Sequence, residues 1–176
     1  MKLLHLCSYF NTNQLYHDLF LNFDKRNISQ IVYVPMKMTA SKNTILNKKH
    51  NINFIFSKIF CHSDRLLYFK KIKKQWRDLK SKNIKFDEIN LIHAHTLFSD
   101  GGLAYQLFGE YKIDYILSVR STDIDIFYKY AIYLRKHIHN ILINSKSVVF
   151  ISHVLKEKLL DKLPFKIRYL VKKNVL

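Results

Sequence analysis

Two histidines stand two residues apart at the end of an apolar run, in the stretch INLIHAHTLFSDGG. If residues 89–95 form a strand, His93 and His95 point to the same face, because side chains alternate between the two faces of a sheet. Imidazoles can bind a metal ion or contact a substrate, but no neighbouring residue completes a set of ligands, so we predict no metal site. We expect His93 to be hydrogen-bonded in the core and His95 to lie nearest the sheet edge.

Two more polar clusters follow expected strands, and both suit a phosphorylated or polyhydroxylated ligand. In the segment SDGG, Ser99 or Asp100 could cap a helix, and the two glycines could let a ligand approach backbone amides. In the segment RSTD, Arg120 could bind a phosphate or pair with Asp123 or Asp100, and Asp123 could cap the next helix. The candidates at this edge are Asp100, Gly101, Gly102, Arg120, Ser121, Asp123 and Ser152.

Alternating strands and helices must position these residues. The apolar pattern predicts strands at residues 2–8, 30–34, 53–56, 89–95, 115–119 and 148–151, and helices at residues 14–26, 65–82, 101–111, 126–144 and 154–163. Pro35 is expected to end the second strand. This order predicts an α/β fold, a Rossmann-like, doubly wound and mostly parallel sheet with helices on both faces. Residues 1–165 would form the domain, and residues 166–176 its last strand or the start of a crossing to another domain.

The composition limits the class of protein. The chain has 176 residues, of which 48% are hydrophobic, and this suffices for the core of one domain. A formal net charge of +17 favours anionic partners. Cys7 and Cys61 form no C-x-x-C motif, which fits a reducing cytoplasm. The first residues lack the apolar run of a signal peptide, and no segment is long enough to span a membrane, so we expect a cytoplasmic protein.

Two other classes of function fit the sequence less well. A nucleic-acid-binding protein would suit the charge, but the basic residues are spread out, and no known binding module appears. A Rossmann oxidoreductase needs G-x-G-x-x-G after its first strand, whereas Gly101, Gly102 and Gly109 all lie far from that strand. We therefore expect neither a nucleic-acid partner nor a dinucleotide cofactor.

Four segments match one known family in motif and in order. They are the turn after the first strand, NLIHAHTLFSDGGLAY, YILSVRSTDID and SVVFISHVLKEKL. Together they resemble the amino-terminal domain of a GT-B glycosyltransferase of family 4, the retaining group 1 transferases. The resemblance implies that His95 contacts the donor sugar and that Arg120 and Asp123 line the cleft. It also implies that the first turn faces the donor diphosphate, although this turn lacks the glycines common in the family; its candidates are Ser8, Asn11 and Asn13.

The resemblance implies a reaction as well. Such a hexosyltransferase moves a sugar from a nucleotide-sugar donor to a saccharide or lipid-linked acceptor, with retention and without a metal or other cofactor, in surface polysaccharide biosynthesis. The second domain of the family carries two glutamates separated by seven residues, a spacing that Glu88, Glu110 and Glu157 do not provide. We therefore expect a truncated chain, or a second chain that supplies the donor-binding domain, and no activity from this chain alone. The alternative is a non-catalytic binding or partner half-domain derived from a glycosyltransferase.

A basic amphipathic helix is expected at residues 65–82. Its apolar stripe would consist of Leu66, Phe69, Ile72, Trp76 and Leu79. The stripe could pack on the sheet and leave the lysines in solvent, or the helix could rest on an anionic membrane, which would make the protein peripheral on the inner face of the cell membrane. The residues that would touch the membrane are Lys70, Lys71, Lys73, Lys74, Trp76 and Arg77.

Overall fold

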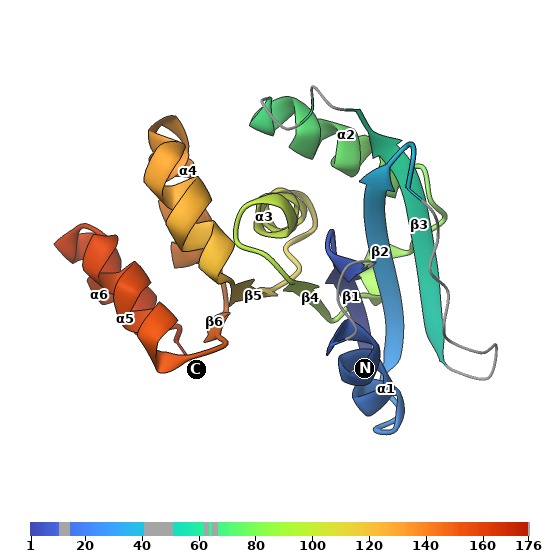
Figure 1. Cartoon of the computed structure of the whole chain (residues 1–176). Coiled ribbons are helices and arrows are strands. Elements are labelled where there is room, and N and C mark those ends of the chain that lie inside the picture. Colours follow the sequence, from blue (N-terminus) through green and yellow to red (C-terminus); the bar gives the residue numbers. More distant parts are fainter. Residues whose placement is uncertain (11–14, 41–50, 62–63, 65–66, 176) are drawn as a thin grey trace. The chain divides into compact units, whose positions relative to one another are not determined.

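The computed structural model describes residues 1–10, 15–40, 51–61, 64 and 67–175 (Figure 1). The strands are β1 (Lys2–Leu6), β2 (Ser29–Lys37), β3 (Ile52–Phe60), β4 (Leu91–Ala94), β5 (Tyr115–Val119) and β6 (Ser147–Phe150). The helices are α1 (Leu15–Asp24), α2 (Tyr68–Lys80), η3 (Phe86–Glu88), α3 (Ser99–Tyr111), η4 (Asp123–Tyr128), η5 (Ile132–Leu134), α4 (Arg135–Asn144), α5 (His153–Lys162) and α6 (Phe165–Lys172).

The strands form a sheet in the order β3-β2-β1-β4-β5-β6, which is the strand order of a Rossmann fold. The pairs β1–β2, β2–β3 and β5–β6 all run parallel. This α/β architecture confirms the fold class predicted from the sequence. The chain divides into two compact units, Met1–Ile92 and His93–Leu176.

The first unit has helices on both faces of its strands. Val32 and Val34 of β2 belong to the core that includes Phe20 of α1. Tyr33, between them in the strand, points to the opposite face, and its hydroxyl donates a hydrogen bond to Asp78 of α2 at 2.8 Å. Successive residues of β2 therefore face different helices, as a doubly wound fold requires.

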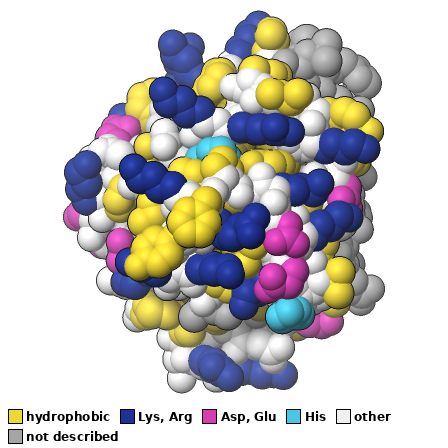
Figure 2. Space-filling view, turned by 90° about the vertical axis from the view of Figure 1, so that its left-hand side faces the viewer, with side chains coloured by type: hydrophobic (Ala, Val, Ile, Leu, Met, Phe, Trp, Pro, Cys, Tyr) yellow, Lys and Arg dark blue, Asp and Glu magenta, His cyan; other side chains and the backbone are white. Residues whose placement is uncertain are grey.

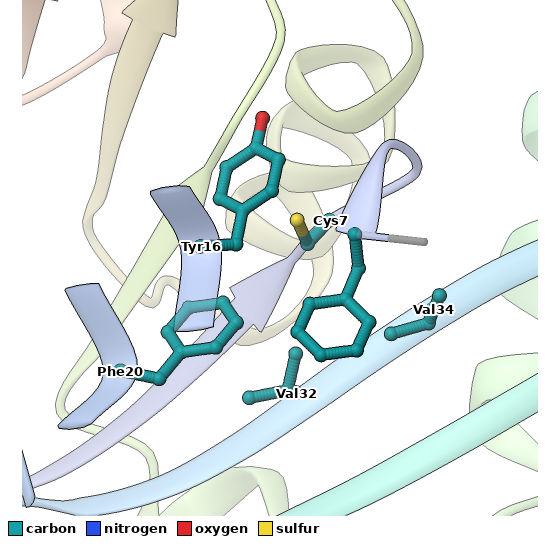
Figure 3. Close-up of a cluster of buried hydrophobic side chains, with 6 residues drawn as sticks. Cys7, Tyr16, Phe20, Val32 and Val34 are labelled. Carbon is teal, nitrogen blue, oxygen red and sulfur yellow. The ribbon is translucent and has the colours of Figure 1, made fainter. Parts of the chain in front are cut away.

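The core of the first unit lies between α1 and the sheet (Figure 3). Figure 3 shows Tyr16 and Phe20 of α1 on the same side of β2 as Val32 and Val34. The ring of Phe10 packs among them, 5.9 Å from that of Phe20 between centroids. These buried side chains hold α1 against its strands. The cluster consists of Cys7, Phe10, Tyr16, Phe20, Val32 and Val34.

Strand β2 continues past Pro35, where the sequence predicts its end. The carbonyl of Tyr33 accepts a hydrogen bond from the N–H of Cys7 at 3.0 Å, so the backbone groups of Tyr33 face β1. Pro35, two residues later, faces the same side, where β1 has already ended, and its missing N–H therefore leaves no ladder bond unmade. On the other side β3 pairs with β2 beyond this point, which makes β3 longer than the strand predicted at residues 53–56.

In the second unit, α3 and α4 cover one face of β5. Tyr115 is buried on that face, and its hydroxyl donates a hydrogen bond to the carbonyl of Ile141 in α4 at 2.6 Å. The helix predicted at residues 126–144 is interrupted: a π-helix, η4, and a 3-10 helix, η5, precede α4. Ala131, between them, has a non-helical backbone with φ −88° and ψ 61°.

The last part of the second unit is helical rather than the last strand that is one of the two predictions for it, and the other, the start of a crossing to another domain, stays a prediction. α6 occupies Phe165–Lys172 and lies beside α4 in Figure 1. The side-chain amide of Asn174 donates hydrogen bonds to the carbonyl of Ile143 in the last turn of α4, at 3.2 Å, and to that of Ser145, the residue after this helix, at 2.8 Å. Among the described residues after α6, only Val175 has a strand-like contact, an isolated parallel bridge to Val148.

Candidate functional site

The carboxylate of Asp123 joins the loops that follow β4 and β5. It is 1% exposed and accepts hydrogen bonds from the backbone N–H groups of Leu97 at 3.1 Å, Phe98 at 3.4 Å and Arg120 at 3.0 Å. The bond to Arg120 is the acceptor half of a capping box, because helical residues begin at Ser121. The sequence predicts this capping role, but it does not predict the link to the HAHTLFSD segment.

Burial determines the protonation of Asp123. It raises the pKa of this carboxyl from 3.8 to about 6, although the three N–H groups favour the carboxylate and act in the opposite direction. Above this pH the three N–H groups face a negative charge, and below it a proton occupies one oxygen. The charge that links the two loops is therefore sensitive to pH just below neutrality.

His93 and His95 lie side by side, as their spacing predicts, with ring centroids 4.0 Å apart. Nε2 of His93 is 2.9 Å from Oγ of Ser118 in β5, which confirms a hydrogen-bonded core histidine. Burial lowers the pKa of His93 to about 4, so its imidazole is neutral at pH 7. His95 is 2% exposed and is thus covered by protein rather than open to solvent. The partner Ser118 carries no recognisable signal in the sequence.

Thr96 completes the amino end of α3, which corrects the prediction of a cap at Ser99 or Asp100. The hydroxyl of Thr96 accepts a hydrogen bond from the N–H of Asp100 at 3.2 Å and donates one to Oδ2 of Asp100 at 3.1 Å. The helix begins at Ser99, and Phe98 is in the N-cap position. The side chain of Phe98 cannot accept a hydrogen bond from the backbone N–H groups of the first turn. The signal available in the sequence was a threonine four residues before an aspartate at the start of the helix.

Gly101 and Gly102 do not present free amides to a ligand, in contrast to the prediction. The N–H of Gly101 donates to the carbonyl of Thr96 at 2.8 Å, and the N–H of Gly102 donates to the carbonyl of Phe98 at 3.0 Å. A Cβ on Gly101 would lie 3.0 Å from Cδ2 of Leu117 and 3.2 Å from the carbonyl oxygen of Thr96. The glycine at position 101 therefore permits close packing of α3 on β5.

The remaining candidates are more open. Ser121 is exposed and Arg120 is half-buried at the start of the helical turns after β5. Ser152 is exposed, but its Oγ accepts a hydrogen bond from the N–H of Leu155 at 3.3 Å and caps α5. In the first unit, Ser8 is half-buried in the turn after β1. Asn11 and Asn13 lie outside the described residues.

The basic helix α2 buries a different stripe from the predicted one. Its buried residues are Tyr68, Ile72, Gln75 and Leu79. Phe69 is 57% exposed, and Trp76 is half-buried with Nζ of Lys80 4.5 Å from its ring centroid, while Leu66 lies outside the described residues. The helix therefore packs on the sheet, and contact of its lysines with a membrane stays a prediction. No helix in the described ranges is both long and apolar enough to cross a bilayer.

On one face of the molecule the positive charge is distributed rather than concentrated. On the face shown in Figure 2, Lys and Arg side chains lie between hydrophobic side chains and do not gather into one patch. This view agrees with the even distribution of lysine along the sequence.

Comparisons with known proteins establish the fold. No family model matches the chain, and no curated protein matches it. A structure of sucrose-phosphate synthase from Thermosynechococcus elongatus is similar over 90% of this chain and 81% of its own, with a TM-score of 0.65 and 15% identity. Apo UGT2 of Phytolacca americana is similar over 94% of this chain and 50% of its own, with a TM-score of 0.50 and 11% identity. Both have the GT-B fold, so the predicted likeness to a GT-B glycosyltransferase domain is confirmed at the level of the fold.

Proposed function

We propose that this chain is the acceptor-side domain of a retaining glycosyltransferase of family 4. It would act in the transfer of a hexosyl group from a nucleotide sugar to a saccharide or lipid-linked acceptor in surface polysaccharide biosynthesis. The observation that carries the proposal is the fold, similar to sucrose-phosphate synthase over 90% of this chain. The link made by Asp123 between the HAHTLFSD and RSTD segments supports it, because these segments carry the resemblance in the sequence.

In this proposal the chain supplies the acceptor side, and a further domain or a second chain supplies the donor-binding side. His95 contacts the donor sugar, while Arg120 and Ser121 hold the acceptor, and neither role needs a resident metal or cofactor. Catalysis then depends on positioning and on stabilisation of the departing diphosphate. The solvent-facing lysines of α2 would hold the protein on the inner face of an anionic membrane.

The test of the proposal is sugar transfer after addition of a donor-binding domain. Transfer of a labelled sugar to saccharide acceptors is measured for the wild type and for three histidine variants. We expect His95→Ala to reduce the turnover of the folded protein by roughly tenfold or more, because the group would act on the reacting centre. Since His95 is buried, its replacement also lowers the thermal midpoint, and turnover is compared at a temperature at which every variant is folded. His93→Ala should mainly lower the thermal midpoint. His153→Ala is the control, because this side chain is 78% exposed on α5, and it should change neither quantity. Equal turnover for wild type and His95→Ala would contradict the proposal that His95 contacts the donor sugar.

A second candidate function is a non-catalytic partner derived from a glycosyltransferase. The burial of the candidate residues favours it, since His95 is 2% exposed and Asp100 and Asp123 are each 1% exposed. Saturation-transfer NMR with a panel of saccharides separates the two functions. Binding of a saccharide that is weakened by His95→Ala supports the transferase. Absence of both saccharide binding and transfer in the presence of the donor-binding domain supports the partner.

A further inference from the structure

A small hollow of about 270 Å³ lies in the first unit, beside the amino-terminal half of α2. Four of its lining residues are basic and belong to α2. They are spaced three and four residues apart, so they occupy one face of the helix. The described residues that line it are Cys61, Asp64, Lys70, Lys73, Lys74 and Arg77.

Among the described residues of the hollow, the one carboxylate is already paired. Oδ2 of Asp64 accepts a hydrogen bond from the N–H of Cys61 at 2.7 Å and lies 3.0 Å from Nζ of Lys74. The amide of Cys61 and the charge of Lys74 hold the pKa of Asp64 below its usual value, and Asp64 in turn raises the pKa of Lys74. At neutral pH the two charges therefore cancel each other.

Three positive charges in the hollow remain unbalanced. Lys70, Lys73 and Arg77 are exposed, and within the described part of the chain none of them has an ion pair. Like charges placed around one concave surface repel one another unless an anion binds between them. The guanidinium of Arg77 can bind a phosphate through two parallel N–H bonds, and the two lysines add point charges.

The hollow lies at the carboxyl ends of two parallel strands. Cys61 directly follows β3, and its thiol is 3.9 Å from the sulfur of Met38, which directly follows β2. Both positions are at the carboxyl ends of parallel strands, the end of an open α/β sheet at which ligands bind, although the hollow lies beside β2 and β3 and not at the switch point of the strand order.

We propose that this hollow binds a phosphate-bearing anion, with Lys70, Lys73 and Arg77 as its ligands and the Asp64–Lys74 pair as its fixed wall. The ligand chemistry is a phosphate or diphosphate group, either free in solution or at the head of a lipid. Binding does not require that the protein transfers sugars, so this inference and the proposed function can fail separately.

The experiment is calorimetric titration of the full chain with pyrophosphate. Wild type should bind with a dissociation constant of about 1 mM or tighter at low salt. The double variant Lys73→Gln and Arg77→Gln should weaken binding by about tenfold or more, because it removes two of the three unbalanced charges. The matched control, Lys71→Gln and Lys80→Gln, removes two charges from the same helix outside the hollow and should weaken binding by about twofold or less. Equal weakening in both pairs, or no binding by wild type, overturns the proposal.

Two further measurements complete the test. Amide NMR of the wild type with pyrophosphate needs no variant; shifts confined to residues 61–77 support the site, and shifts spread over the chain overturn it. Sedimentation with vesicles of phosphatidylcholine, with and without phosphatidylglycerol, identifies the source of the phosphate. Competition between pyrophosphate and the anionic vesicles supports a lipid headgroup, and pyrophosphate binding without competition supports a free phosphate.

Discussion

At the scale of single residues, Asp123 and His93 give the second unit two opposite responses to pH. The raised pKa of Asp123 means that the folded state holds its proton up to about pH 6, whereas the unfolded chain releases it near 3.8. Its contribution to stability is therefore full below pH 3.8 and is lost as the pH rises through about 6. The lowered pKa of His93 acts in reverse: its contribution is full above pH 6.5 and is lost as the pH falls through about 4.

The variant Asp123→Asn separates these two responses. The amide mimics the protonated carboxyl but does not titrate. The variant therefore lacks the stabilisation that the wild type gains at acid pH when folded Asp123 takes up a proton. We expect the free energy of unfolding of wild type, relative to Asp123→Asn, to increase by about 2 kcal/mol between pH 7 and pH 4. Urea unfolding at each pH measures this difference, and all groups that titrate alike in both proteins cancel from it. A difference that stays constant with pH would show that Asp123 has an ordinary pKa.

At the scale of elements, α3 contains two glycines whose substitution has opposite expected effects. A Cβ at Gly101 would lie 3.0 Å from Cδ2 of Leu117, 3.2 Å from the carbonyl oxygen of Thr96 and 3.3 Å from Cγ2 of Ile141. We expect Gly101→Ala to destabilise the protein by about 1–2 kcal/mol, because the crowding outweighs the higher helix propensity of alanine.

The matched control in the same helix is Gly109→Ala. A Cβ at Gly109 meets no atom within 4 Å, so only the helix propensity changes, and we expect stabilisation by about 1 kcal/mol. Thermal unfolding of the two variants measures both effects. Stabilisation of the chain by both substitutions would contradict the role of Gly101 in the packing of α3 on β5.

The helix α2 illustrates which property of an element the sequence determines. Its periodicity predicts a helix correctly, but the predicted stripe includes Phe69, which is 57% exposed. Tyr68 and Gln75 are buried instead, one position before the predicted Phe69 and Trp76. The adjacent aromatic residues Tyr68 and Phe69 begin two neighbouring rows of side chains along this helix. The helical period alone does not determine which of these rows faces the sheet. Contacts from β2 decide it, since the hydroxyl of Tyr33 bonds to Asp78.

At the scale of the whole molecule, the net charge of +17 opposes the compact state. Ions screen exposed charges that lie further apart than about 10 Å at 0.1 M salt. We therefore expect the thermal midpoint to rise between about 20 mM and about 300 mM sodium chloride, by roughly 2–4 °C for each kcal/mol of repulsion removed. Potassium chloride should have the same effect if the cause is screening. A midpoint that falls with salt would mean that attraction in the surface ion pairs exceeds the net repulsion.

The sequence alone determined the α/β class, the approximate position of each strand and the likeness to a GT-B domain. Period-two and helical patterns are local properties, and the four motif segments lie in an order that needs no coordinates. Only the tertiary structure decided the roles within the site. Thr96 rather than Ser99 or Asp100 completes α3, Gly101 packs rather than binds, and Asp123 reaches across to Leu97. These roles depend on residues from other loops and strands that approach in space, and the spacing along one chain does not contain that information.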